Sequence, residues 1–160
     1  MNQIHKATHE GPLILSGISI PAYVLEDGTR LLSRGGLQES VGLSKGGSSK
    51  IGMQRMGVFL IGIFGKGIEI KDLIARIEDP IVFQPFRGGR TAYGYEATIL
   101  ADICDVVFEA NKKGKLLPQQ KHVAERCEML MRAFAKVGII ALVDEATGYQ
   151  EIRDKLALQN

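Results

Sequence analysis

The fold is decided by residues 99–134, ILADICDVVFEANKKGKLLPQQKHVAERCEMLMRAF. In its first part, apolar residues recur at the spacing of one face of an α-helix, beginning at Ile99 and ending near Ala110. The same spacing repeats from Val123 to Phe134. Between the two parts, Gly114 suits a helix C-cap and Pro118 suits the start of a helix. The stretch therefore predicts two amphipathic helices that form an antiparallel helical hairpin.

The stretch that follows, residues 138–150 (GIIALVDEATGYQ), turns abruptly from apolar to polar. Its first residues predict either one buried strand or a buried helix end. Asp144 and Glu145 then have three interpretations, one of which is a polar interface site. They could hold a metal or serve in acid–base chemistry, but no third ligand is placed by the sequence. Otherwise Asp144 or Thr147 caps the N-terminus of a last short helix over residues 151–158, where acidic groups are stabilised.

The N-terminal half is rich in strand-forming residues. Residues 12–16 and 18–25 predict a β-hairpin with Ser16-Gly17 as its turn, preceded by a loose arm over residues 1–10. A second turn at residues 26–29 leads to a short third strand. Ser33 suits the N-cap of a short helix that ends near residue 42.

The middle of the chain is punctuated by glycine, serine and proline. Residues 42–57 predict a flexible basic loop, and the overlapping apolar residues 53–64 favour a strand or a loop about equally. A short helix over residues 70–77 and a strand over residues 80–86 follow. Strands come first and helices later, which predicts an α+β fold with a small antiparallel β-meander and short helices, the C-terminal helical hairpin and a short terminal helix.

The length of 160 residues predicts a single compact domain, with a β-rich lobe over residues 11–92 and a helical lobe over residues 93–160. A composition of 45% hydrophobic and 24% charged residues is that of an ordinary globular protein, which needs neither a disulfide nor a metal to fold. Cys104 and Cys127 lie in helical patterns outside any CxxC pair, so we expect reduced core thiols. No signal peptide and no membrane-spanning run are found, and a cytoplasmic location is expected.

Positive charge is concentrated in one segment, although the formal net charge is only +2. Between Arg30 and Lys66 the only acidic residue is Glu39. Residues 42–49 resemble a phosphate-binding loop, but Ser48 stands where the lysine of that motif belongs, which argues against a nucleotide site.

This charge distribution leads to the main functional hypothesis, a non-enzymatic protein that binds nucleic acid through its phosphates. Tyr93 and Tyr95 could stack on bases, or could instead pack at the entry to the first long helix. The predicted phosphate contacts are Arg34, Lys45, Lys50, Arg55, Arg87 and Arg90.

Two alternatives belong to other functional classes. The long amphipathic helices and the apolar residues 58–64 could cover a second subunit, which would make the protein an interaction or oligomerisation module. Asp144 and Glu145 with a metal would make it a hydrolase or nuclease, the least favoured hypothesis. No cofactor is expected, and neither His5 and His9 nor His122 predicts a metal site.

Five short stretches resemble a family of uncharacterised proteins from phages, prophages and plasmids. They are residues 8–11 (THEG), 20–21 (IP), 24–30 (VLEDGTR), 93–97 (YGYEA) and 141–150 (ALVDEATGYQ). The signature around Asp144, Glu145, Thr147, Gly148 and Tyr149 is the most specific part. In that family a phage C-terminal domain follows this region, so the resemblance implies an N-terminal portion with no assigned activity. The hairpin and the helix after Ser33 more weakly resemble phage antirepressor N-terminal domains, which implies a regulatory role.

Overall fold

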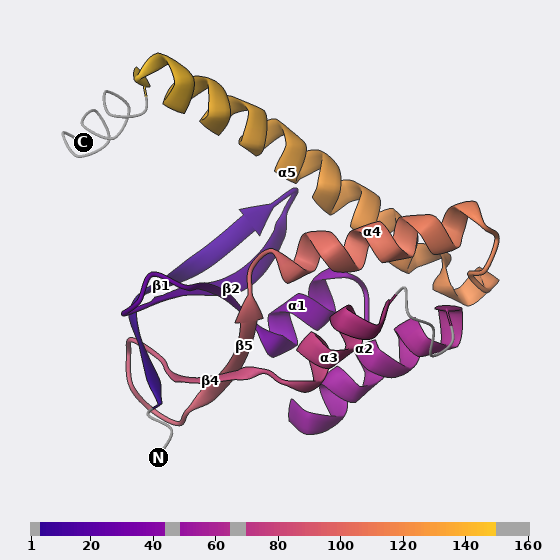
Figure 1. The fold of residues 1–160 in the computed structure, drawn as a ribbon, viewed down its shortest axis with the longest axis horizontal. Coiled ribbons are helices and arrows are strands. Elements are labelled where there is room, and N and C mark those ends of the chain that lie inside the picture. The colour runs from indigo at the N-terminus through magenta and orange to yellow at the C-terminus, as the bar shows by residue number, and fades with distance from the viewer. Residues whose placement is uncertain (1–3, 44–48, 65–69, 150–160) are drawn as a thin grey trace.

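The structure is a computed structural model that describes residues 4–43, 49–64 and 70–149, without the side chains of residues 49–55 and 64. Its elements are β1 (His5–Leu15), β2 (Ile18–Leu25), β3 (Arg30–Ser33), α1 (Arg34–Ser40), α2 (Ser49–Phe64), α3 (Lys71–Glu78), β4 (Ile81–Gln84), β5 (Ala92–Glu96), α4 (Ile99–Lys112), a 3₁₀ turn (Pro118–Gln120) and α5 (Lys121–Thr147). The fold is α+β, with the sheet beside two groups of helices (Figure 1).

The strands close into a ring in the order β1-β2-β3-β5-β4, and β4 returns to pair in parallel with the start of β1. The β1–β2 hairpin turns at Ser16 and Gly17, whose φ angles of 49° and 79° match the twist of a tight hairpin. β3 approaches β5 closely at Gly94, where an added Cβ would lie 2.9 Å from the Leu32 carbonyl oxygen. The hairpin and the third strand are therefore confirmed.

The main core lies between the sheet and the helices. Fully buried side chains come from β2, α1, α2, α4 and α5, and they include Ile20, Leu37, Leu60, Ile103 and Leu130. α4 and α5 run antiparallel against each other, so the predicted helical hairpin is confirmed (Figure 1). The N-cap at Ser33 is also confirmed, because its Oγ accepts a hydrogen bond of 3.0 Å from the Gly36 amide.

Several predictions for the first 96 residues are wrong. Residues 5–10 are not a loose arm but belong to β1, since His5 and Lys6 pair with β4 and the residues from Ala7 onward pair with β2. The predicted basic loop over residues 42–57 is helical from Ser49 onward, because α2 begins there. Residues 53–64 are likewise neither strand nor loop but part of α2, since burial of Leu60 and Ile63 overrides their glycines. Residues 92–96 form the strand β5, which pairs with β3 and β4 in the ring, rather than the entry to a helical lobe.

The second long helix extends far beyond the predicted one. α5 contains 27 residues and α4 contains 14, which correspond to about 40 Å and about 21 Å of helix. Residues 138–143 are therefore neither a strand nor buried, because α5 has left α4 behind by that point. In Figure 1 the far end of α5 lies apart from the other described elements.

The end of α5 also changes the interpretation of the polar residues there. Thr147 is not an N-cap, since its hydroxyl donates 2.8 Å to the Val143 carbonyl in the last helical turn. Gly148 is the C-cap, with a φ of 78°. The predicted last helix over residues 151–158 lies outside the described residues. Within the described residues, no helix combines the length and apolarity needed to cross a membrane.

Candidate functional site

The first predicted phosphate contact, Arg34, lies in the interior. Its side chain is 6% exposed, and its guanidinium carbon lies 4.1 Å from the centre of the Tyr93 ring. This geometry is a cation–π contact shielded from solvent. Arg34 begins α1 directly after its N-cap, so the helix start points the cation inward toward β5. The prediction that Arg34 contacts phosphates on the surface is therefore wrong.

Tyr95 is also buried, at 2% exposure, and its hydroxyl donates a 2.5 Å hydrogen bond to the Ile77 carbonyl. That carbonyl belongs to the last turn of α3, where backbone acceptors have no partner within the helix. Tyr95 thus fastens α3 to β5, and it cannot stack on a base. One face of the Tyr93 ring is covered by Arg34. Tyr93 and Tyr95 flank Gly94 within strand β5, so the strand determines where their side chains lie, and they do not stand at the entry to a helix.

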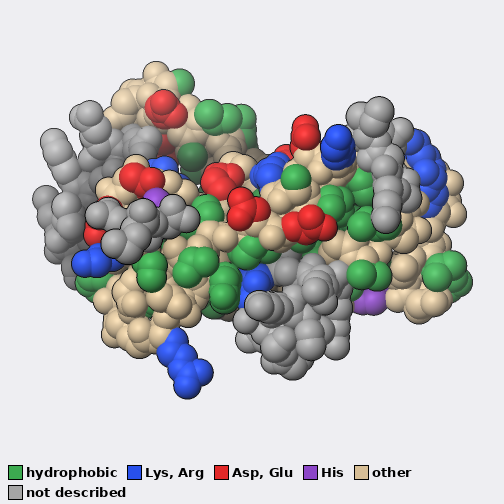
Figure 2. Space-filling model, turned by 60° about the horizontal axis from the view of Figure 1, so that its bottom comes forward, with side chains coloured by type: hydrophobic (Ala, Val, Ile, Leu, Met, Phe, Trp, Pro, Cys, Tyr) green, Lys and Arg blue, Asp and Glu red, His purple; other side chains and the backbone are tan. Residues whose placement is uncertain are grey.

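The other predicted contacts do not come together in the described structure. Arg87 and Arg90 are exposed on the β4–β5 turn, where the Arg87 amide donates to the Glu10 carboxylate at 2.9 Å. Lys45 lies outside the described residues, and the side chains of Lys50 and Arg55 are not described. Among the described side chains on the face drawn in Figure 2, basic and acidic groups are interspersed and do not form a large basic patch.

The carboxylates of Asp144 and Glu145 do not form a catalytic pair. Both lie in the last turns of α5, where neighbouring residues point about 100° apart around the helix axis. Asp144 is 9% exposed and Glu145 is exposed. Among the described residues, no three His, Cys, Asp or Glu side chains gather where a metal could bind. A hydrolytic site at these two residues therefore receives no geometric support.

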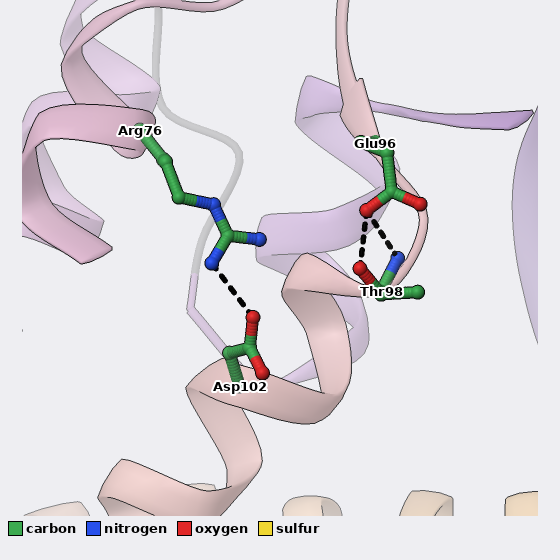
Figure 3. A network of polar contacts seen from close by, with 4 residues as sticks. All are labelled: Arg76, Glu96, Thr98 and Asp102. Atoms are coloured by element: carbon green, nitrogen blue, oxygen red, sulfur yellow. Dashed lines mark hydrogen bonds and ion pairs between the residues drawn. The ribbon is translucent and has the colours of Figure 1, made fainter. Parts of the chain in front are cut away.

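A polar cluster that the sequence did not predict lies where α3 meets α4 (Figure 3). Arg76 forms a 2.7 Å ion pair with Asp102, and Glu96 accepts hydrogen bonds from the hydroxyl and the amide of Thr98. The paired side chains of Arg76 and Asp102 are 43% and 47% exposed. Each group in this cluster is used to join neighbouring elements, so its role is structural.

The two cysteines lie side by side in the interface of α4 and α5. A hydrogen bond with the Cys104 thiol, assisted by burial, raises the pKa of Cys127. Both thiols are free and buried. A thiol that resists ionisation is a poor nucleophile, so Cys127 serves packing, and Cys104 is buried beside it.

The feature that the sequence analysis missed is the outer end of α5. We call residues 137–143 the apolar segment; it contains no charged or hydrogen-bonding side chain. Its five large side chains are each 52–62% exposed, namely Val137, Ile139, Ile140, Leu142 and Val143. A helix that is apolar on all sides is normally buried on all sides. The continuation of the helix could be predicted, because no pair of turn-forming residues separates Phe134 from the apolar segment. The exposure of its outer end could not, because it depends on where α4 ends.

A groove of about 530 Å³ runs along α5 just before the apolar segment, between α5 and the tip of the β1–β2 hairpin. The hairpin contributes Ile14, Leu15 and Ser16. α5 contributes apolar Met129, Ala133 and Val137 together with four charged side chains, Glu125, Glu128, Arg132 and Lys136. Ile14 is 65% exposed and Met129 is 39% exposed. The groove and the apolar segment therefore form one elongated surface with exposed apolar side chains along its length.

No protein-family model, no curated protein and no solved structure matches this chain. The resemblance to phage and plasmid proteins therefore stays a prediction.

The contact between Tyr95 and α3 gives a prediction for stability. Burial raises the pKa of Tyr95, so the folded protein keeps the phenol proton after the unfolded chain has lost it. The stability contributed by neutral Tyr95 is full below a pH of about 10 and is lost as the pH rises further. Tyr95→Phe should cost about 1–3 kcal/mol at pH 7, because the Ile77 carbonyl loses its donor.

Urea unfolding at pH 7 and at a series of pH values above 9 tests this prediction. Tyr95→Phe should lose less stability over the alkaline range than the wild type does. Tyr93→Phe is the matched control and should behave like the wild type, since its ring keeps the contact with Arg34. Equal losses at alkaline pH in the wild type and in Tyr95→Phe would contradict the assignment.

Proposed function

We propose that this protein is a non-enzymatic oligomerisation module whose copies associate through the outer part of α5. The observation that carries the proposal is the apolar segment, which leaves the core and presents five large apolar side chains to solvent. Contiguous exposed apolar surface on a folded protein is characteristic of an interaction site.

The energetics support association of moderate strength. Complete burial of a large aliphatic side chain contributes about 1.5–3 kcal/mol, so covering the exposed half of five such side chains contributes about 5 kcal/mol per copy. Two copies together gain about 10 kcal/mol, which is comparable to the 4–15 kcal/mol or so that association costs. Association that depends on protein concentration is the expected result.

This location differs from the one that the sequence suggested for such a module. Residues 58–64 belong to α2, whose Met56, Leu60 and Ile63 face the core. Among the described large apolar side chains of residues 58–64, only Val58 is exposed, at 69%. That segment is therefore largely used inside the monomer, whereas the apolar segment of α5 is not.

Replacing Ile140 by Asp should shift the protein toward monomer without unfolding it, because Ile140 is exposed and makes little use of the core. Sedimentation velocity over a range of protein concentrations measures the shift, and circular dichroism checks the fold. Ala135→Asp is the matched control, since Ala135 is exposed on the same helix but precedes the apolar segment. A wild-type protein that stays monomeric at high concentration would contradict the proposal.

Nucleic-acid binding is a second proposal, and the exposed Arg87 and Arg90 favour it. Both are exposed on the β4–β5 turn, in which the Gln84 side chain donates a 3.0 Å hydrogen bond to the Gly89 carbonyl. The resemblance to phage regulators would give this activity a biological setting. Arg34 and Tyr95 take no part, because both are buried.

Fluorescence anisotropy with duplex DNA across a salt series tests the second proposal. If both arginines contact phosphates, Arg87→Ala/Arg90→Ala should lower the slope of log affinity against log salt by about 1.8. Arg132→Ala, on the remote α5, is the control and should leave the slope unchanged. Absence of binding by the wild type at low salt would remove this candidate function.

A further inference from the structure

The charged side chains of the groove follow a regular order along α5. Two acids come first, at Glu125 and Glu128, and two bases follow, at Arg132 and Lys136. All four line the same groove, so they share one face of the helix. Met129 and Ala133 lie among them on that face and supply apolar contact surface.

The order of acids and bases along α5 is complementary to the same order on a second, antiparallel copy of the helix. Glu125 and Lys136 are equally far from a point between Leu130 and Met131, and the midpoint of Glu128 and Arg132 is Leu130. A second α5 that runs antiparallel across this point would place each acid opposite a base of the other copy. A two-fold symmetric interface requires this property, since residue i meets residue j and residue j meets residue i.

We propose that the occupant of the groove is the α5 helix of a second copy of this chain, antiparallel and centred near Leu130. The inference rests on the proposed function and specifies its geometry. Each Glu125 faces the second copy's Lys136, and each Glu128 faces the second copy's Arg132. A parallel pair of helices would instead bring acids to acids and bases to bases, which is unfavourable.

The same register gives the end of the apolar segment an apolar partner. Val143 and Leu117 also have their midpoint at Leu130, and Leu117 is 52% exposed before the 3₁₀ turn that precedes α5. In the antiparallel pair, the end of each apolar segment therefore reaches Leu117 of the other copy. The opposite charges select the register, and the contact of Val143 with Leu117 adds one apolar pair at each end of it.

A contact within the monomer is compatible with this arrangement. Arg132 forms a 2.6 Å ion pair with Glu128 one helical turn away, and these side chains are 76% and 54% exposed. Pairs this exposed contribute little to stability, so sharing or exchanging partners at the interface has a small cost.

Charge reversal on the groove face tests the proposal. One variant, Arg132→Glu/Lys136→Glu, is acidic at all four positions, and a second, Glu125→Lys/Glu128→Lys, is basic at all four. Each alone should weaken dimerisation by about tenfold or more, because like charges replace opposite charges at every contact. An equimolar mixture should form a heterodimer at least as tight as the wild-type dimer. Sedimentation velocity of each variant and of the mixture measures this, with circular dichroism to show that both are folded.

The outcomes separate this inference from the proposed function. If both charge variants dimerise as the wild type does while Ile140→Asp is monomeric, the apolar segment associates in another way and the antiparallel register is overturned. If the wild type itself is monomeric, the proposed function fails as well. Weakened single variants with a restored mixture would support the register, and a mixture that remains monomeric would overturn it.

Discussion

The structure depends on a mismatch in length between two helices that pack together. α4 covers the first half of α5 with an interface that buries Val123, Cys127 and Leu130, and then it ends. α5 continues as a helix for about 19 Å beyond what α4 can cover. Apolar residues at that end have no core to join, so the hydrophobic effect that folds the monomer also favours association of the remaining surface.

The closed sheet and the helices packed on it enclose the main core, which includes the first half of α5. Tyr95 joins β5 to α3, and Arg34 packs against the Tyr93 ring. Both residues were predicted to bind nucleic acid, but in the structure they stabilise the fold. The sequence does not show that both side chains point into the interior. A cluster of charged residues in the sequence does not show which of their side chains point inward. In this fold the pairing of β3 with β5 determines it.

Local signals predicted the local elements well. Ser16-Gly17, the cap at Ser33 and the periodic stretch from Ile99 to Phe134 each gave the right structure, because neighbours in sequence determine turns, caps and amphipathic helices. Failures came where distant contacts decide. Residues 5–10 became a strand only because β2 and β4 pair with them, and the apolar segment was expected to be buried because its sequence alone cannot show that α4 stops short.

The most direct test is the distance between two nitroxide labels, one on each copy, attached at Ala146→Cys and measured by pulsed electron paramagnetic resonance. The native thiols are buried and should not be labelled. Antiparallel helices centred near Leu130 place the two labels about 47 Å apart along the helix axis. A distance near that value is the predicted result. A short distance of roughly one helix diameter, about 10 Å, would show parallel helices, and no measurable distance between copies would contradict association through α5.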